Sequence, residues 1–323
     1  MNTASGLSAS RVLLTGGAGF LGTAVARVLE RRGVESVYVP RKREFDLTKA
    51  GDVERLFGEV RPEVVIHLAA EVGGIGANQS NPGRYFYANL MMGINLIEQS
   101  RVSGVNRFIQ IGTICAYPKY ATVPFKESDL WSGYPEETNA PYGVAKRALG
   151  VMLEAYHRQY GLQSAYVLPV NLFGPGDNFD LGTSHVIPAL IRKCVEAKQS
   201  GSATLPCWGS GEATREFLFV DDAAEAIVRA AERINEPGPI NLGTGREISI
   251  RELGRMIASI CGFEGELIWD HSRPDGQPRR CVDWGRARKL LGWQPSVDLE
   301  EGLRRTVSWY TASATQHTRA GPG

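Results

Sequence analysis

Tyr142 and Lys146 are the residues whose types and spacing most directly suggest chemistry. The spacing Tyr-x-x-x-Lys places both side chains on one face of a helix, about one turn apart. A free tyrosine has a pKa of about 10, and a nearby ammonium lowers that pKa by favouring the phenolate. Thr113 adds a hydroxyl directly after an apolar segment. Together they predict a hydride-transfer site in which Tyr142 is the acid/base, Thr113 polarises a carbonyl and Lys146 tunes the tyrosine.

A glycine-rich turn near the start of the chain predicts a dinucleotide site. Gly16, Gly19 and Gly22 form the pattern GxxGxxG directly after an apolar segment, and Phe20 and Leu21 open the amphipathic segment that follows. Such glycines allow a tight turn and a close approach of the backbone to a pyrophosphate, which the helix N-terminus attracts. An ordinary strand-to-helix turn is the alternative interpretation.

The residues after the second apolar segment indicate which dinucleotide binds. An acidic residue at this place would accept a hydrogen bond from the 2′-hydroxyl of NAD, but the sequence has the run Pro40-Arg41-Lys42-Arg43. Arg41 and a neighbour can pair with a 2′-phosphate through charge-assisted hydrogen bonds, so we expect NADP rather than NAD. A solvated run of charges would give the same pattern. Asp46 is expected near the adenine.

The elements that must position these residues alternate along the first half of the chain. Buried strands are expected at residues 11–15, 35–39, 63–69, 107–112 and 164–169. Helices are expected at residues 20–32, 50–59, 82–102 and 139–160. This alternation predicts βαβ units and a parallel sheet covered on both faces. The expected fold class is therefore α/β, a Rossmann-type doubly wound sheet with ligands at its carboxyl edge.

The regular alternation of strands and helices ends after Pro169, which predicts a smaller α/β lobe. Helices are expected at residues 185–198, 221–234, 248–261 and 299–310, and short strands at 204–208 and 240–243. The predicted dinucleotide-binding domain comprises residues 1–172, with 216–247 returning to it. Residues 173–215 and 248–311 form the predicted substrate-binding lobe, and 312–323 a disordered tail.

Composition excludes several function classes. The 323 residues include 36 basic and 35 acidic ones, a balance that argues against a nucleic-acid surface. No apolar run approaches the roughly 20 residues of a membrane span, and residues 1–10 have no apolar signal segment. The five cysteines form no CxxC pair, so we expect neither a disulfide framework nor a metal site, and we expect a reducing cytoplasm.

Longer segments carry a family resemblance that covers residues 11–310. The chain resembles the extended short-chain dehydrogenase/reductases that act on nucleotide sugars, and within them the GDP-L-fucose synthase branch. The supporting segments are 72–78, 115–119, 139–142, 171–179, 184–190, 208–211, 215–218 and 273–276.

The resemblance implies a two-part chemistry on a GDP-bound 4-keto-6-deoxy-hexose. The ketone acidifies the protons on C3 and C5, an acid/base pair inverts both carbons, and NADPH reduces the ketone at C4. Cys115 and His185 stand at the positions of that pair. Ordinary pKa values near 8.5 and 6.5 suit proton transfer near neutral pH. Without the resemblance, Cys115 is interpreted as a small buried residue and His185 as a helix N-terminal residue bonded to the backbone.

The resemblance also implies further contacts and an assembly. Leu68, Ala69 and Ala70 would lie along the cofactor, and Asn171 and Val186 would meet the sugar nucleotide. Arg215 and Arg280 are candidates for the GDP phosphates, since an arginine fork suits two oxygens. Trp208 would pack beside the guanine or sugar, with core packing as the alternative. Helices 82–102 and 139–160 would pair across a homodimer.

Two other functions remain open from the sequence. One is a nucleotide-sugar epimerase or C4 reductase that has only part of this chemistry, including an epimerase that cycles NAD, or that acts on a different sugar. The other is a non-catalytic dinucleotide-binding protein. The presence of Tyr142, Lys146, Cys115 and His185 together favours the full reaction.

Overall fold

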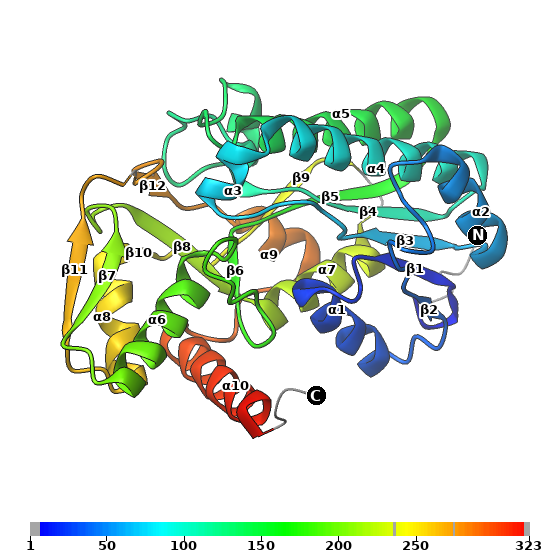
Figure 1. The fold of residues 1–323 in the computed structure, drawn as a ribbon. Coiled ribbons are helices and arrows are strands. Elements are labelled where there is room, and N and C mark those ends of the chain that lie inside the picture. The colour runs from blue at the N-terminus through cyan, green and yellow to red at the C-terminus, as the bar shows by residue number, and fades with distance from the viewer. Residues whose placement is uncertain (1–6, 235–236, 274, 320–323) are drawn as a thin grey trace.

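A six-stranded parallel sheet forms the centre of the molecule in the computed structural model, which describes residues 7–234, 237–273 and 275–319. The strand order is β2-β1-β3-β4-β5-β9, and all neighbouring strands are parallel (Figure 1). The strands are β1 (Val12–Thr15), β2 (Val37–Tyr38), β3 (Val64–His67), β4 (Arg107–Ile111), β5 (Gln163–Pro169) and β9 (Pro239–Leu242). This sheet confirms the predicted α/β class.

Helices cover both faces of the sheet, as continuous apolar strands require. On one face lie α2 (Ala50–Val60), α4 (Pro82–Val102) and α5 (Ala140–Tyr160). On the other lie α1 (Phe20–Arg31), α7 (Val220–Arg233) and α9 (Gly285–Leu291) (Figure 1). Because β1 and β3 are buried at every position, their side chains pack against helices on both sides.

A second group of elements lies beyond the carboxyl edge of the central sheet. Strand β8 (Thr214–Phe219) is its hub, because it pairs with β6, β10 and β12. The other strands are β6 (Asn171–Phe173), β7 (Thr204–Trp208), β10 (Glu247–Ser249), β11 (Glu266–Asp270) and β12 (Arg279–Arg280). The helices are α6 (Val186–Ser200), α8 (Ile250–Cys261) and α10 (Leu299–Arg319). Short helical segments occur at η1 (Leu7–Ala9), α3 (Ile75–Ser80), η2 (Ile114–Ala116) and η3 (Glu127–Trp131).

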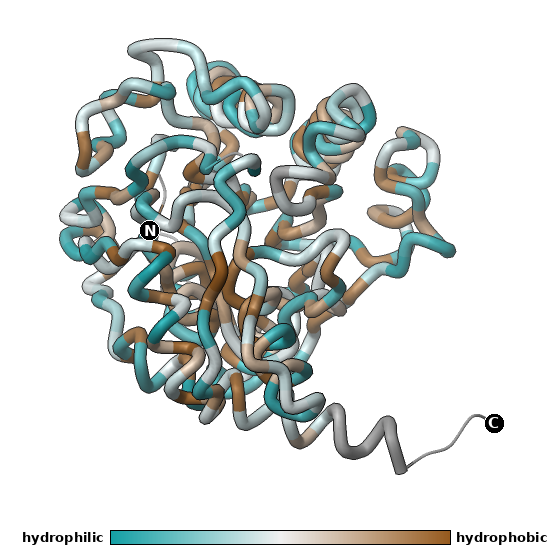
Figure 2. The backbone as a smooth tube through the Cα atoms, turned by 60° about the vertical axis from the view of Figure 1, so that its left-hand side comes forward, coloured by the Kyte–Doolittle hydropathy of each residue, from teal (hydrophilic) through white to brown (hydrophobic). Residues whose placement is uncertain are grey.

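The buried apolar residues form two clusters. The larger one surrounds the central sheet, from Leu13 on β1 to Ile240 on β9. The smaller one joins α6, α8 and α10 around Ile191 and Leu253. Figure 2 shows the hydrophobic segments gathered inside the molecule.

One buried carboxylate ties three separated chain segments together. Glu216 on β8 accepts hydrogen bonds from the backbone N–H groups of Thr244 and Gly245 at one oxygen. Its other oxygen accepts from the N–H of Val282 at 2.8 Å. Burial raises the pKa of Glu216, while these N–H donors oppose that rise.

The structure differs from the sequence-based expectation in two places. Helix α10 continues to Arg319, beyond the expected end at 310, so the predicted disordered tail is helical up to that residue, and 320–323 lie outside the described residues. The segment 214–219 forms β8 of the second sheet rather than part of the central one. No described helix is both long and apolar enough to cross a membrane.

Candidate active site

The glycine turn between β1 and α1 has the shape needed to hold a pyrophosphate. Gly16 has a φ of +72°, and a Cβ there would lie 2.7 Å from the backbone nitrogen of Ala69. A Cβ on Gly22 would clash with the carbonyl of Gly16, so both positions need glycine. Gly19 is the N-cap of α1 and provides no side-chain cap, which leaves the N–H groups of the first turn for an anion. Phe20 and Leu21 pack partly onto the core.

The end of β3 is held against the same turn. The N–H of Leu68 donates to the carbonyl of Thr15 at 3.1 Å, and the N–H of Ala69 reaches the Thr15 hydroxyl at 3.5 Å. That hydroxyl also bonds Nδ1 of His67 at 2.7 Å. Burial and the charge of Lys146 lower the pKa of His67 well below its usual value, so the ring is neutral. Leu68 and Ala69 therefore border the glycine turn, and the expected position of the segment 68–70 along the cofactor stays a prediction.

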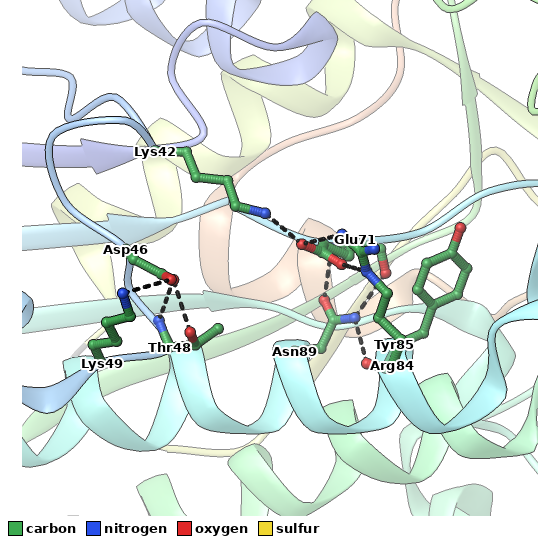
Figure 3. A network of polar contacts seen from close by, with 8 residues as sticks. All are labelled: Lys42, Asp46, Thr48, Lys49, Glu71, Arg84, Tyr85 and Asn89. Atoms are coloured by element: carbon green, nitrogen blue, oxygen red, sulfur yellow. Dashed lines mark hydrogen bonds and ion pairs between the residues drawn. The ribbon is translucent and has the colours of Figure 1, made fainter.

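Lys42, one of the cationic residues after β2, joins a network around Glu71 that the sequence did not predict (Figure 3). Glu71 accepts from Lys42 at 2.7 Å and from Arg84 at 2.7 Å. The Asn89 side chain fixes the Glu71 backbone: its Oδ1 accepts from the Glu71 N–H at 3.2 Å, and its Nδ2 donates to the Glu71 carbonyl at 2.7 Å. The hydrogen bonds from Arg84 and Lys42 lower the pKa of Glu71 to about 2. Arg41 is exposed beside this network.

Asp46 is engaged by its own turn. Its carboxylate accepts from the Thr48 hydroxyl at 2.7 Å and the Thr48 N–H at 3.1 Å (Figure 3). The Thr48 hydroxyl is the main cause that lowers the pKa of Asp46. Asn95 on α4 donates to the neighbouring carbonyl of Leu47 at 3.0 Å, which anchors the turn to the helix. The expected position near an adenine stays a prediction.

Thr113, Cys115 and Tyr142 come together at the carboxyl end of β4. Thr113 is the N-cap of η2, and its hydroxyl accepts from the N–H of Cys115 at 3.1 Å. A Cβ on Gly143 would clash with the Cys115 carbonyl, so η2 packs directly on the first turn of α5. Burial raises the pKa of Tyr142, and the neighbouring Cys115 raises it further.

Lys146 is almost completely buried one turn along α5. Its side chain is 1% exposed, and burial lowers its pKa to about 8. The ammonium lies 5.9 Å from the centroid of the Tyr142 ring. The Tyr166 hydroxyl donates to the Lys146 carbonyl at 3.0 Å and fixes this part of the helix. The pKa shift at Tyr142 is upward, opposite to the sequence-based expectation, because burial and the neighbouring Cys115 both disfavour the phenolate.

Two buried arginines from the second sheet reach the same place. Nη1 of Arg280 donates to the sulfur of Cys115 at 3.4 Å. Arg215 donates to the carbonyls of Thr214 and Asp275 at 2.7 and 3.0 Å. Burial and the nearby Arg280 lower the pKa of Arg215 to about 10. The structure thus brings Thr113, Cys115, Tyr142, Lys146, Arg215 and Arg280 into one cluster.

The remaining expected substrate residues have other partners. Asn171 on β6 donates to the Glu216 carbonyl at 3.0 Å. Trp208 is 58% exposed at the end of β7, where the Arg273 guanidinium lies 4.9 Å from the centroid of its ring, so it is not core. Val186 opens α6 and packs on the smaller core.

His185 is the N-cap of α6, and its side chain caps no backbone N–H. Desolvation by surrounding atoms lowers its pKa. The preceding loop lies on the segment after β3, because the N–H of Gly74 donates to Thr183 at 3.2 Å. Among the described residues, no hydrogen bond or ring contact joins His185 or Trp208 to Cys115. The described residues also contain no cluster of His, Cys, Asp or Glu that could hold a metal ion.

Comparison with known proteins agrees with this geometry. Residues 12–243 match the model of the NAD dependent epimerase/dehydratase family, to which the chain therefore belongs. GDP-L-fucose synthase from Escherichia coli is 40% identical over 313 residues, which cover 94% of this chain and 97% of that protein.

Two solved structures have the same fold. A GDP-6-OMe-4-keto-L-xylo-heptose reductase from C. jejuni superposes with a TM-score of 0.88 and 30% identity, over 94% of this chain and 98% of that one. A GDP-L-fucose synthetase from Naegleria fowleri bound to NADP superposes with a TM-score of 0.86 and 28% identity, over 94% of both chains.

Proposed function

We propose that this protein is a GDP-L-fucose synthase, which epimerises C3 and C5 of a GDP-4-keto-6-deoxy-hexose and reduces C4 with NADPH. The observation that carries this proposal is the cluster of Thr113, Cys115, Tyr142 and Lys146 at the carboxyl edge of the sheet. That edge is where ligands bind in open parallel sheets, and the glycine turn opens onto it. The 40% identity to a GDP-L-fucose synthase over nearly the whole chain supports the substrate class.

The reduction step needs a proton at the oxygen of C4. When bound at the glycine turn, NADPH supplies the hydride for that carbon. Tyr142 has a raised pKa, so it is a neutral phenol at neutral pH and can donate its proton to the developing alkoxide. The hydroxyl of Thr113 can donate a second hydrogen bond to the same oxygen. Lys146, buried one turn away, orients this end of α5 and can bond a ribose hydroxyl.

The epimerisation steps need a base and an acid on opposite faces of the sugar. We assign these roles to Cys115 and His185. The thiol is partly exposed beside Tyr142, and the imidazole has a lowered pKa at the start of α6. One group removes a proton from the carbon next to the ketone, and the electron pair moves onto the ketone oxygen. The other group delivers a proton to the opposite face, which inverts the carbon.

The cofactor assignment to NADP is supported by the charges after β2. Gly16, Gly19 and Gly22 hold the pyrophosphate, and Leu68, Ala69 and Ala70 line its neighbourhood. Arg41 is available there, and Lys42 and Arg84 together outnumber the single carboxylate of Glu71 by one charge (Figure 3). This net cationic end suits a 2′-phosphate. The 2′-phosphate-bearing cofactor in a structural relative supports the same choice.

The substrate side is proposed from the second sheet. Arg215 offers a buried guanidinium and Arg280 a second one, which suits a diphosphate. Trp208 is an exposed aromatic face for the guanine or sugar, and Asn171 and Val186 border the same lobe. We propose a division into a cofactor domain and a lobe that departs from the expected bounds, 1–172 with 216–247 and 173–215 with 248–311, in two places. One crossing lies near Val220, because Phe217 and Phe219 on β8 pack in the smaller apolar cluster. The segment from Val282 to Trp293 belongs with the cofactor domain, because its apolar side chains pack in the larger cluster.

The assembly and location are also proposals. Exposed apolar side chains on α4 and α5, including Tyr87 at 59% and Val151 at 45%, support a homodimer through these helices. The five cysteines are free thiols, which supports a reducing cytoplasm.

A C4 reductase without epimerisation is the second candidate. It is favoured by one observation: the contacts of His185 do not join it to Cys115. A solved structure of similar fold is named as a reductase of a GDP-bound 4-keto-heptose, which supports this candidate.

The test incubates the protein with GDP-4-keto-6-deoxymannose and NADPH in deuterated water. We expect NADPH oxidation together with deuterium at C3 and C5 of the product. Cys115→Ser should abolish the deuterium incorporation, with cofactor binding unchanged. NADPH oxidation without deuterium in the wild-type product would instead establish the bare reductase, and no oxidation at all would contradict both candidates.

A further inference from the structure

Arg280 on β12 and Cys115 in η2 form a contact between the second sheet and the carboxyl end of the central sheet, 165 positions apart in the chain. We propose that Arg280 is a positioning residue that holds Cys115 as a thiolate and thereby makes it the base for epimerisation. This inference rests on the proposed function, and it goes beyond the phosphate contact expected for Arg280 from the sequence.

The guanidinium of Arg280 is fixed by its surroundings. Strand β12 pairs in parallel with β8, and Arg280 is opposite Arg215 in that register. Its Nε donates to the Gln277 side chain at 2.9 Å, and Gln277 in turn donates to the carbonyl of Lys119 at 2.8 Å. The side chain of Arg280 is therefore held before any ligand arrives. Its Nη1 then points at the sulfur at 3.4 Å.

The charges around the sulfur favour its anion. Arg280 from β12 and Arg215 from β8 are both buried cations close to Cys115, and Tyr142 from α5 also faces the sulfur. The carboxylates of Asp275 and Glu136 interact electrostatically with these arginines. Two buried guanidiniums beside each other are unfavourable unless an anion lies between them. Arg215 donates only to backbone carbonyls, and the groups whose negative charge favours its guanidinium are Cys115, Asp275 and Glu136. A thiolate at Cys115 therefore adds favourable negative charge beside both arginines.

The carboxylates of Asp275 and Glu136 interact with the arginines through space, and within the described structure neither accepts a hydrogen bond from Arg280. Asp275 accepts from the N–H and hydroxyl of Ser210 at 2.8 and 2.7 Å. Glu136 accepts from Thr138 and Asn139, both at 2.6 Å. Within the described structure Nε of Arg280 donates to the neutral amide of Gln277 and Nη1 to the sulfur of Cys115, so Nη2 is left for the phosphate contact proposed above.

The proton balance gives Arg280 a defined role. The thiolate of Cys115 takes the proton from the sugar carbon beside the ketone and becomes a thiol, while the electron pair moves to the ketone oxygen. Arg280 stays protonated throughout. It acts by raising the fraction of thiolate at neutral pH, because a hydrogen bond to the charged form favours that form.

The first experiment measures alkylation of Cys115 by iodoacetamide against pH, with peptide mass spectrometry to read this cysteine alone. The other four cysteines are buried. Arg280→Met should raise the midpoint of the profile by about one pH unit and slow alkylation at neutral pH about tenfold. Arg280→Lys should restore part of the rate, since an ammonium keeps the charge without the fork.

Arg279→Met is the matched control. Arg279 is the neighbouring residue, but it is exposed and pairs with Glu247, on the other side of the strand. Its variant should retain the wild-type profile. Identical profiles for wild type and Arg280→Met, or equal shifts in both arginine variants, would overturn the proposal. Binding of NADPH by each variant checks that it is folded.

The second experiment follows solvent deuterium entering GDP-4-keto-6-deoxymannose with no NADPH present. Arg280→Met should slow this exchange about tenfold at neutral pH relative to the wild type. At high pH the difference in exchange rate should be smaller, because the thiol ionises there without Arg280. A pH-independent loss of exchange would show a structural role instead and overturn the proposal. A third result would separate the two proposals. If Arg280→Met shifts the alkylation profile but the wild-type protein catalyses no deuterium exchange, the proposed function is wrong and the Arg280–Cys115 pairing stands.

Discussion

Replacing Lys146 by methionine should make the protein more stable, and the gain should depend on pH. The ammonium is 1% exposed, and burial lowers its pKa from 10.5 to about 8. At about 1.4 kcal/mol per unit, this shift corresponds to a penalty of roughly 3 kcal/mol for keeping the charged side chain in the folded protein. Methionine has a similar length and no charge, so it removes the penalty.

The direction of the pH dependence follows from proton binding. Below the folded-state pKa, both states hold the proton and the full penalty applies to the wild type. Between the pKa values of the folded and unfolded states, the unfolded chain binds more protons, so wild-type stability rises with pH. The advantage of Lys146→Met should therefore shrink by about 2 kcal/mol between about pH 7 and about pH 10.

Urea denaturation of both proteins at the two pH values measures this difference. Other groups that titrate in the same range cancel, because only residue 146 differs. Lys289→Met, which removes an exposed ammonium on α9, is the matched control for the loss of a surface charge. A stability difference that stays constant with pH would refute the reasoning, since the buried charge would then carry no penalty. Loss of ketone reduction in Lys146→Met is expected and does not affect this measurement.

Three further predictions test the turn, the phenol and the cation cluster. Gly22→Ala should lower the free energy of unfolding by about 1–3 kcal/mol, because its Cβ would lie 2.5 Å from the Cα of Gly17. Gly58→Ala is the control: its Cβ would have no atom within 4 Å, and the variant should gain about 0.5–1 kcal/mol in free energy of unfolding. Equal urea midpoints for the two variants would contradict the prediction. Tyr142→Phe should bind NADPH in a fluorescence titration yet reduce no ketone, and measurable turnover would remove the phenol from its role. Glu71→Gln should strengthen NADPH binding several-fold relative to NADH, because Lys42 loses its carboxylate partner; an unchanged ratio of Kd values would place the 2′-phosphate elsewhere.

Local signals explain which parts of the fold could be predicted. The expected helix 82–102 coincides with α4, since Pro82 is suited to its first turn. Helix α5 ends at Tyr160 because Gly161 adopts a left-handed conformation as its C-cap. The second sheet could not be predicted in the same way. Strand β8 pairs with β6, β10 and β12, whose residues lie far apart in the chain, and β12 is only two residues long.

In the candidate site, too, the local arrangement could be predicted from the sequence and the contacts between distant segments could not. Tyr142 and Lys146 share a helix face, so their spacing was enough to place them together. The contact of Arg280 with Cys115 depends on the register of β12 with β8, which no local pattern reports. The pairing of Glu71 with Lys42 and Arg84 is equally non-local: a lone acidic residue after a strand gave no signal of its partners.

The buried carboxylate of Glu216 limits how the molecule can be rebuilt. It collects N–H groups from the turn at Thr244 and Gly245 and from Val282, where the chain passes between its two parts. A chimaera that takes its second sheet from a relative must take all three segments together: β8 with Glu216, the turn at Thr244 and Gly245, and the segment around Val282. Otherwise the Glu216 carboxylate is buried without its hydrogen-bond donors. If only one of these segments is grafted to change the sugar specificity, we expect the chimaera to misfold, whatever its contacts with the sugar.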